Sequence, residues 1–452
     1  MLSELAAMSA GLLHGPDSGF EGVSTDTRTL QAGQLFVALR GPKFDGHDYL
    51  AQAAGQGAAG ALVEVVPQTG LGCVQVPDTR LGLGALGHGW RMHSEALVIG
   101  LTGSNGKTTL KEMIAAILGR NAPTLATLGN LNNDIGVPLT LCRLREERFA
   151  VVEMGANHAG EIDYLTKLVA PDVAVLNNAG RAHLEGFGSL EGVARAKAEI
   201  IHGLGPDGVF VLNADDRFAD LWRELARGRK QRTFGVREAA DVSSPVDDYQ
   251  VVWTDDSFEA RFPVVTPLGD LIVSLPLAGE HNRMNALAAV AASLEAGATI
   301  DSIVPALQSL TPVAGRLCPV PGAAGARLID DSYNANPDSV LAALRVLATA
   351  PGRRTFVLGD LAELGREAVE LHRRIGEAAG EIGIERLLTV GSLSGAAGEA
   401  FAGEHRHFDD QSGLRDLLGS TLTQEDSVLI KGSRSAQLDR LVAALRVGQD
   451  AC

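Results

Sequence analysis

The chain has 452 residues, which at about 150 residues per domain predicts three domains. Hydrophobic residues make up 45% of it and charged residues 21%, so packed cores are expected and a disordered, collagen-like or coiled-coil chain is excluded. The formal net charge of −16 argues against a nucleic-acid binder and against a basic membrane-surface protein, because anionic phosphates need a basic face.

The first block of the chain alternates short apolar runs with glycine-rich turns. Residues 34–39 and 60–66 are predicted strands, and the small residues of 51–60 between them favour a helix. We therefore expect a small α/β domain over residues 1–92.

A second pattern begins with the buried strand predicted at 96–101, followed by a glycine turn and the helix 109–118. Further apolar strands are predicted at 149–155 and 172–178. Apolar strands that alternate with helices indicate a mostly parallel sheet covered on both faces. The helix at 285–296 closes this block, so residues 93–312 are predicted to form a central domain of the P-loop type.

A third block carries strand candidates at 326–330, 355–359, 386–391 and 427–432. Helical patterns follow these strands, which predicts a Rossmann-like domain over 313–452, and the whole chain is assigned to the α/β class. Ligands of open parallel sheets bind beyond the carboxyl ends of the strands, so the polar ends of these runs predict a second binding crevice.

The chain shows no targeting or membrane signal. Its start, MLSELAAMSAGLL, lacks a basic region, and no apolar run approaches the roughly 20 residues that span a bilayer. The four cysteines contain no C-x-x-C pair, which argues against a zinc site. We expect a cytoplasmic monomer without a membrane or nucleic-acid partner.

The most informative segment is G-L-T-G-S-N-G-K-T-T at 100–109, which follows a predicted buried strand and opens a helix. Backbone N–H groups in that position hold phosphate oxygens, Lys107 can reach the β- and γ-phosphates, and Thr108 can ligate Mg²⁺. The first glycine of the strict motif is replaced by Leu101, and a glycine-rich turn with an incidental lysine is the alternative. The predicted ATP-binding loop comprises Gly103, Ser104, Asn105, Gly106, Lys107, Thr108 and Thr109.

Glu153 ends the apolar run F-A-V-V-E and is predicted to hold Mg²⁺ beside this loop. A glutamate at a strand end is often only a solvated loop residue, and that alternative stays open.

These residues resemble those of the Mur ligase superfamily, ATP-dependent enzymes that form amide bonds in peptidoglycan synthesis. The form T-G-S-N-G-K-T-T matches that family's phosphate loop. The likeness extends over the whole chain, through the segments S-T-D-T-R…G-Q-L-F-V-A-L-R-G-P-K-F-D-G-H (24–47), G-N-L-N-N-D-I-G-V-P-L-T (129–140), E-M-G-A-N-H-A-G-E-I (153–162), H-L-E-G-F-G-S-L-E-G-V-A-R-A-K (183–197), D-D-S-Y-N-A-N-P-D-S (330–339), G-D-L-A-E-L-G (359–365) and K-G-S-R-S (431–435).

The resemblance implies two Mg²⁺ ions, with His183 and Lys197 as ligands in addition to Thr108 and Glu153. Lys197 would be carbamylated, which turns a cation that Mg²⁺ repels into an anion that binds it. A loop histidine without function and an exposed helical lysine are the alternatives. Asn133 would face the metal or the substrate, unless it belongs to an ordinary Asn-rich turn.

It also implies an adenine site at Asn282 and Asn285, for which helix capping is the alternative. Arg316 would approach the γ-phosphate and Asp331 the ribose, unless they form structural salt bridges. The catalytic group implied by the resemblance is therefore Lys107, Lys197, His183 and Arg316.

Two substrate sites are implied. A uridine diphosphate end would bind Thr27, Lys43, Phe44 and His47, although a turn with a solvated lysine is as plausible for Lys43. A dipeptide needs a cation for its carboxylate and acceptors for its amine. Its candidates are Asn334, Asn336, Asp338, Lys431, Ser433 and Arg434.

The implied reaction joins D-alanyl-D-alanine to UDP-N-acetylmuramoyl-tripeptide through an acyl phosphate, giving the pentapeptide, ADP and phosphate for the cell wall. One alternative is the family's ligase for the third amino acid, whose D-N-P-R motif is absent here, where D-S-Y-N-A-N-P stands at 331–337. Folylpolyglutamate synthetase is a more distant alternative. A nucleotide-dependent binding switch is the alternative from another class.

Overall fold

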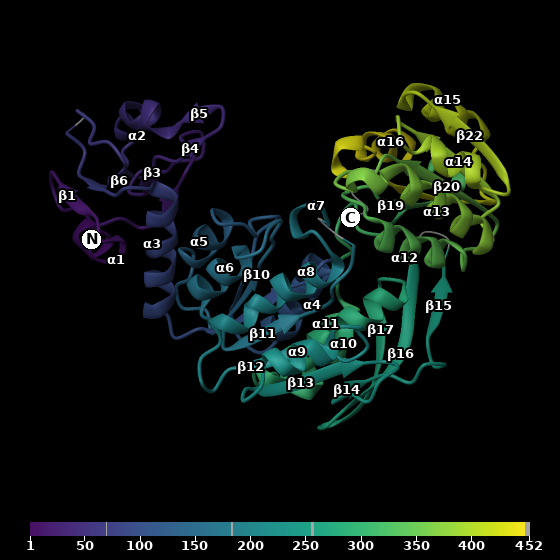
Figure 1. The fold of residues 1–452 in the computed structure, drawn as a ribbon, viewed down its shortest axis with the longest axis horizontal. Helices are drawn as coiled ribbons and strands as arrows, with labels where there is room; N and C mark the ends of the chain where they lie inside the picture. The colour runs from purple at the N-terminus through teal and green to yellow at the C-terminus, as the bar shows by residue number, and fades with distance from the viewer. Residues whose placement is uncertain (69, 182–183, 255–256, 448–452) are drawn as a thin grey trace.

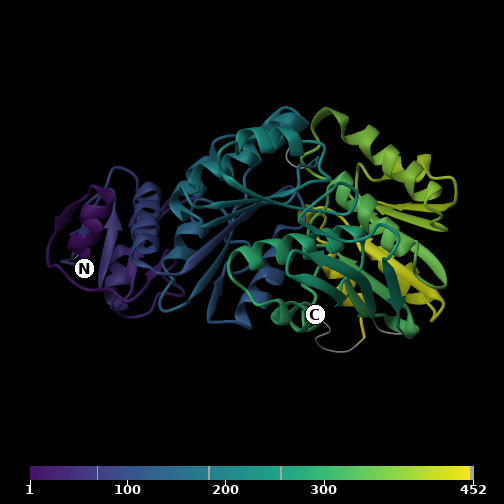
Figure 2. The same cartoon turned by 90° about the horizontal axis from the view of Figure 1, so that it is seen from below.

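The computed structural model describes residues 1–68, 70–181, 184–254 and 257–447. They form three lobes in chain order, an N-terminal lobe at one end of the molecule, a central lobe and a C-terminal lobe (Figure 1). Figure 2 shows the central and C-terminal lobes packed side by side, while the N-terminal lobe adjoins the central lobe at the other end of the molecule. The α/β fold in three parts that the sequence predicted is confirmed.

The N-terminal lobe holds a sheet of order β1–β7–β6–β3–β2, parallel except for β1 against β7. Its strands are β1 (Leu12–His14), β2 (Val23–Ser24), β3 (Leu35–Val37), β6 (Gly60–Val63) and β7 (Cys73–Gln75), beside the separate hairpin β4 (Arg40–Gly41) and β5 (Phe44–Asp45). Its helices are α1 (Leu2–Ser9), α2 (Leu50–Gly55) and α3 (Thr79–His93).

Helix α3 joins the N-terminal lobe to the central one. The Arg91 guanidinium donates to the Val169 and Ala170 carbonyl oxygens at 3.1 Å and to the Asp172 carboxylate at 3.0 Å. The predicted domain boundary after residue 92 falls at the end of this helix, and the boundaries stay predictions.

The central lobe is built on a sheet of order β15–β16–β14–β13–β12–β11–β8–β10–β9, with β17 beside β16. Its strands are β8 (Leu97–Thr102), β9 (Thr124–Ala126), β10 (Phe149–Glu153), β11 (Val173–Leu176), β12 (Val209–Asn213), β13 (Lys230–Gly235), β14 (Val242–Ser243), β15 (Gln250–Trp253), β16 (Phe258–Thr266) and β17 (Gly269–Leu275). Its helices are α4 (Lys107–Gly119), α5 (Gly136–Leu141), α6 (Glu161–Val169), α7 (Leu184–Phe187), α8 (Leu190–Ala198), α9 (Ala219–Leu225), α10 (Glu280–Glu295) and α11 (Ile300–Gln308).

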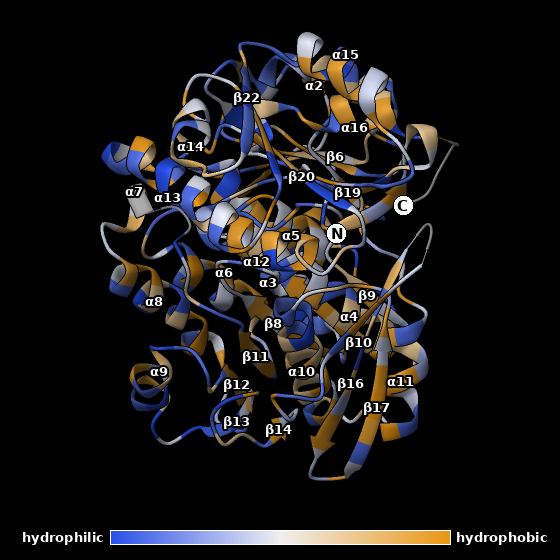
Figure 3. Cartoon of the chain, turned by 90° about the vertical axis from the view of Figure 1, so that its right-hand side faces the viewer, coloured by the Kyte–Doolittle hydropathy of each residue, from blue (hydrophilic) through white to orange (hydrophobic). Residues whose placement is uncertain are grey.

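The parallel strands β8 to β14 are covered by helices on both faces, because successive side chains of a strand point to opposite sides. In β8, Ile99 and Leu101 pack in one core with α4, α10 and α11. Val98 packs on the other side with α5, α6 and α8. In Figure 3 the strands of this sheet are mostly in the hydrophobic colour, whereas the helices carry both colours.

An antiparallel extension that the sequence analysis missed continues this sheet. β15, β16 and β17 pair antiparallel and reach the C-terminal lobe (Figure 1). Phe258 and Trp253 of this extension pack into the hydrophobic core of that lobe. The alternating burial of β16 is typical of a strand with one covered face.

The C-terminal lobe contains a sheet of order β18–β19–β23–β20–β21–β22, parallel except for β18. Its strands are β18 (Cys318–Pro321), β19 (Arg327–Asp331), β20 (Arg353–Gly359), β21 (Arg386–Val390), β22 (Glu404–Phe408) and β23 (Asp426–Lys431). Its helices are α12 (Pro337–Leu347), α13 (Ala368–Glu381), α14 (Gly395–Ala400), α15 (Gln411–Thr421) and α16 (Asp439–Leu445). The four strands predicted in this block are present as β19, β20, β21 and β23.

Among the described residues, no helix has both the length and the apolar content that a membrane crossing requires.

The core under the phosphate loop sets the first prediction. Ile114 of α4 is fully buried between the sheet and α10, so Ile114→Ala should lower the free energy of unfolding by about 2–5 kcal/mol through lost apolar burial and a cavity. Leu268, which is 66% exposed in the turn between β16 and β17, supplies the control. Leu268→Ala should change the free energy of unfolding by less than about 0.5 kcal/mol. Urea denaturation measures both, and equal losses would contradict this account of the core.

Candidate functional site

A cavity of about 1060 Å³ opens where the carboxyl ends of the central strands face the C-terminal lobe. Its walls come from the loop after β8, the end of β10, the start of α10 and the loops after β19 and β23. The carboxyl ends of parallel strands are the usual ligand-binding edge of such sheets. The two crevices predicted from the sequence therefore meet in one cleft.

The phosphate loop forms the floor of this cleft and leads into α4. Gly106 is the N-cap of α4, with φ 77°, and a Cβ at this residue would lie 2.5 Å from Asn285 Oδ1. Glycine is required at this position by both the backbone conformation and the close approach of α10. The N-terminus of α4 is thereby left open toward the cleft, which suits an anion.

Lys107 folds back over its own loop in this structure. Its Nζ donates to the Gly103 carbonyl oxygen at 2.8 Å and to the Ser104 carbonyl oxygen at 3.4 Å. Burial lowers the pKa of Lys107, against the opposing charge of Glu153, and the nearby Arg316 lowers it further. The cation is thus poorly solvated, and an anion in the cleft would stabilise it.

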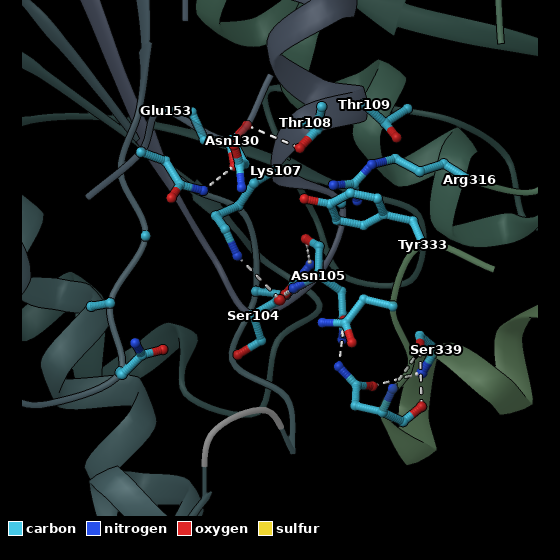
Figure 4. A pocket seen from close by; sticks show the side chains of 18 of the residues that line it. Ser104, Asn105, Lys107, Thr108, Thr109, Asn130, Glu153, Arg316, Tyr333 and Ser339 are labelled. Atoms are coloured by element: carbon cyan, nitrogen blue, oxygen red, sulfur yellow. Dashed lines mark hydrogen bonds between the residues drawn. The ribbon is translucent and has the colours of Figure 1, made fainter. Parts of the chain in front are cut away.

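Thr108 and Glu153 lie together behind the loop. The Thr108 hydroxyl donates to Glu153 Oε2 at 3.0 Å, and the Asn132 amide donates to Glu153 Oε1 at 2.8 Å (Figure 4). Glu153 is 1% exposed, so the alternative of a solvated loop glutamate is wrong. A hydroxyl and a carboxylate beside a phosphate loop are the oxygen donors that Mg²⁺ uses with nucleotides.

Lys197 of α8 is buried, with 1% of its surface exposed. Its Nζ donates to the Ala156 carbonyl oxygen at 3.3 Å and lies 5.4 Å from the centre of the Phe187 ring. Burial lowers the pKa of Lys197 to about 7, with the Lys107 charge adding to the effect. The alternative of an exposed helical lysine is wrong. His183 lies outside the described residues.

Asn282 and Asn285 face the cleft from the first turn of α10. The Asn282 amide donates to the Ala278 carbonyl oxygen at 2.8 Å, and Asn285 Oδ1 accepts from the Asn177 amide at 2.8 Å. The N-cap of α10 is Gly279 and no side chain caps it, so helix capping by either asparagine is wrong. Their assignment to adenine stays a prediction.

The C-terminal lobe contributes cations and an acid to the cleft. The Arg316 guanidinium lies 4.3 Å from the centre of the Tyr333 ring and makes no salt bridge within the described residues (Figure 4). Asp331 pairs with Lys431 at 2.7 Å, and Lys431 is 2% exposed. Lys431 also donates to the Asn334 carbonyl oxygen at 3.1 Å.

The other dipeptide candidates divide into two groups. Asn334, Asn336 and Asp338 line the cleft with Lys431. Ser433 and Arg434 do not belong to its wall. The Ser433 hydroxyl accepts from the Ala362 N–H at 2.8 Å, and Arg434 lies 3.7 Å from Asp439.

The residues predicted for the uridine diphosphate end also lie away from this cleft, in the N-terminal lobe. Thr27 is buried, and Phe44 is 56% exposed beside Lys43 at the β4–β5 hairpin. The His47 Nε2 accepts from the Glu64 N–H at 2.8 Å, and its Nδ1 donates to Asp45 Oδ1 at 2.6 Å. Its ring is therefore already used to connect the hairpin to β6 and its following turn.

Sequence reasoning missed several residues of the wall, among them His281, Tyr333 and Asn132. Each is adjacent in sequence to a predicted residue or lies within a quoted segment, and that adjacency was the available signal. Burial lowers the pKa of His281 to about 4, against the attraction of Asp331. Asn133, the predicted neighbour of Asn132, lines the cleft and accepts from the Gly136 N–H at 2.9 Å, which fits the turn alternative.

Comparison with known proteins agrees with this geometry. Three family models match in chain order: "Mur ligase family, catalytic domain" at residues 19–72, "Mur ligase middle domain" at 101–293 and "Mur ligase, glutamate ligase domain" at 315–434. UDP-N-acetylmuramoyl-tripeptide–D-alanyl-D-alanine ligase of Escherichia coli is 46% identical over 98% of each chain.

Solved structures give the same result. MurF from Acinetobacter baumannii is 39% identical over 98% of each chain with a TM-score of 0.91. MurF ligase from Thermotoga maritima in complex with ADP is 28% identical with a TM-score of 0.84, over 94% of this chain and 96% of that one. A phosphate loop, a buried acid and opposing cations in one cleft, together with these full-length matches, show that this chain belongs to the Mur ligase family.

Proposed function

We propose that this protein is an ATP-dependent ligase that joins D-alanyl-D-alanine to UDP-N-acetylmuramoyl-tripeptide, yielding UDP-N-acetylmuramoyl-pentapeptide, ADP and phosphate. The observation that carries the proposal is the shared cleft, in which the phosphate loop of one lobe faces Arg316 and Lys431 of another. Relatives that carry the name of this ligase are similar along nearly the whole chain, and one solved relative binds ADP.

The reaction proceeds in two steps. An oxygen of the tripeptide carboxylate attacks the γ-phosphorus of ATP, the bond to the β-phosphate oxygen breaks, and ADP leaves with that electron pair. The amine of D-alanyl-D-alanine then attacks the acyl carbon, loses a proton, and expels phosphate as the amide forms. Two anions must meet in the first step, so Lys107 and Arg316 are assigned to screen their repulsion.

Mg²⁺ fits the donors of the cleft, and we assign two ions to it. Thr108 and Glu153 would hold one ion, whose charge would stabilise the phosphate oxygens. Within the described ranges no group of three or more His, Cys, Asp or Glu side chains forms a metal site. That agrees with Mg²⁺, which binds nucleotide sites through one or two carboxylates plus phosphates and water. His183 and Lys197 are proposed for the second ion.

Lys197 is proposed to carry a carbamate. Its pKa of about 7, caused by burial, leaves part of the amine neutral near pH 7, and only the neutral amine attacks CO₂. The amine nitrogen bonds to the carbon of CO₂ and loses one proton, which leaves an anion in place of a cation. A buried anion there would suit a divalent metal.

The remaining assignments follow the position of each side chain. Asn282 and Asn285 are proposed for adenine and Asp331 for the ribose, at the end of the cleft formed by α10 and β19. Thr27, Lys43, Phe44 and His47 are proposed for the uridine diphosphate end, and Asn133, Asn334 and Lys431 for the peptides. Ser433 and Asn336 are not assigned to the peptides, because Ser433 lies outside the wall of the cleft and Asn336 is bonded at both ends of its amide by the protein.

Addition of a third amino acid is the weaker candidate, because D-S-Y-N-A-N-P stands where that ligase has D-N-P-R. A binding switch is weaker still, because it would not need cations from a second lobe at the phosphate loop. The reaction is proposed to run in the cytoplasm because it consumes ATP, and the monomeric state stays a prediction.

The test offers the purified protein ATP, Mg²⁺ and UDP-N-acetylmuramoyl-tripeptide with either D-alanyl-D-alanine or single amino acids. We expect ADP release and pentapeptide only with the dipeptide. Lys107→Ala should lower kcat by at least about 100-fold, because it removes a charge that acts on the transferred phosphate.

Lys167→Ala is the matched control, since Lys167 is an exposed lysine of α6 paired with Asp163. It should retain full activity. ADP release that ignores both peptides would support the switch and contradict the ligase, and full activity of Lys107→Ala would contradict the assigned role of the loop.

The lowered pKa of Lys197 predicts that the stability of the protein depends on pH. Between pH 7 and its ordinary pKa of 10.5, burial makes the folded protein bind fewer protons at Lys197 than the unfolded chain does. The free energy of unfolding should therefore rise with pH across this window relative to Lys197→Met, and the difference should be flat below pH 7. Denaturation in CO₂-depleted buffers measures it, and a difference that falls across the window would contradict the lowered pKa.

The carbamate predicts a spectroscopic signal. With ¹³C-bicarbonate, the wild-type protein should show a carbamate resonance that disappears in Lys197→Met. Lys167→Met removes an exposed lysine and leaves the buried Lys197 amine in place, so this control should keep the signal. Identical spectra for wild type and Lys197→Met would overturn the modification.

A further inference from the structure

The N-terminus of α12 in the C-terminal lobe touches the phosphate loop of the central lobe. The Asn336 amide donates from Nδ2 to Asn105 Oδ1 at 2.7 Å. Its Oδ1 accepts from the Ser339 N–H at 2.9 Å and so caps α12. Both ends of this side chain amide are therefore occupied by the protein, although Asn336 was predicted to contact the dipeptide.

Asn105 is held from its other side by the segment after β11. Its N–H donates to Asn178 Oδ1 at 2.9 Å, and its carbonyl oxygen accepts from the Asn177 and Asn178 amides at 3.1 and 3.0 Å. The backbone at Asn105 is thus fixed within the central lobe. Its side chain is fixed by the other lobe, through Asn336.

A second contact lies beside the first. The Asp338 carboxylate accepts from the Arg181 N–H at 2.7 Å and lies 3.6 Å from the Arg181 guanidinium. A Cβ at Gly180 would lie 3.0 Å from Asp338 Oδ2 and 3.1 Å from the Asn105 amide nitrogen. A side chain at residue 180 would therefore require the Asp338 carboxylate or the Asn105 amide to move by a few tenths of an ångström.

The far end of α12 is also held by the central lobe. Thr349, just beyond the helix, accepts from the Trp253 indole N–H of β15 at 3.1 Å. Val251 and Trp253 pack against the same core as Val340 and Leu344 of α12. Helix α12 therefore contacts the central lobe at both ends, at the phosphate loop and at the antiparallel extension.

We propose that Asn336 is a positioning residue for the phosphate loop rather than a dipeptide ligand, and that it acts by orienting the Asn105 side chain. Asn336 fixes the Asn105 side chain in the loop, so the orientation of this side chain at the cleft depends on α12 being seated against the loop. The same seating brings Arg316 and Lys431 to the cleft.

This inference rests on the proposed use of ATP, but its test measures binding of ADP alone and so stands apart from the ligation assay.

Asn336→Ser is the central variant, because serine caps a helix as asparagine does but is too short to reach Asn105. Without either peptide, isothermal titration should show ADP affinity lower by about fivefold, the loss of one neutral hydrogen bond. Asn105→Ala should lower the ADP affinity by a similar factor. The double variant should bind ADP no more weakly than either single variant, because all three proteins lack the same hydrogen bond between Asn336 and Asn105.

Ser339→Ala is the matched control. It removes the hydroxyl that accepts from the Asn336 N–H but leaves the bond between Asn336 and Asn105. Its ADP affinity should stay within about twofold of the wild type. Steady-state kinetics of Asn336→Ser should show a higher KM for ATP, with the KM for D-alanyl-D-alanine unchanged at saturating ATP.

Three results would overturn the proposal. Unchanged ADP affinity with a raised KM for the dipeptide would make Asn336 a dipeptide ligand. Losses that multiply in the double variant would show that Asn105 and Asn336 act separately. An equal loss in Ser339→Ala would trace the effect to the helix end and not to the contact between lobes.

Discussion

The site depends on cations that the fold holds with little hydration. Lys431 at the cleft and Lys197 behind it are buried, and burial lowers the pKa of Lys107, in a chain whose net charge is −16. Lys431 forms a short salt bridge with Asp331, whereas Lys107 and Lys197 form none within the described residues. A triphosphate and a carboxylate are the anions that would stabilise the others, and bringing two such anions together is the difficulty of the reaction.

The fold brings the charged side chains of the cleft together at the ends of parallel strands. Parallel strands place their carboxyl ends at one edge, so β8 delivers Lys107 and Thr108 while the neighbouring β10 delivers Glu153. The C-terminal lobe repeats the arrangement, and β19 and β23 deliver Asp331 and Lys431 side by side. Each lobe contributes its strand ends to the same space, which neither lobe encloses alone.

The sequence predicted the parts that depend on local pattern. The phosphate loop, the apolar strands and Glu153 follow from glycine spacing and hydrophobic runs, and the structure shows them together. Contacts between distant segments were not predictable. Burial of Lys197, the pairing of Asp331 with Lys431 and the use of Asn336 by Asn105 depend on how lobes and helices pack. β15 and β17 lack a continuous apolar run because one face of each is partly exposed. The alternating residues of β16 were an available strand signal that the search for continuous apolar runs did not use.

The antiparallel extension also contacts the C-terminal lobe, through Val251, Trp253 and Phe258. The chain passes from α11 to β18 through residues 309–317, and Arg316 lies within that crossing. The extension holds the end of α12 that lies away from the phosphate loop, where the Trp253 indole donates to Thr349. A change of two residues in each strand of β15 and β16 would move this contact by about 7 Å. The placement of α12 at the phosphate loop therefore also depends on the length of strands that lie outside the wall of the cleft.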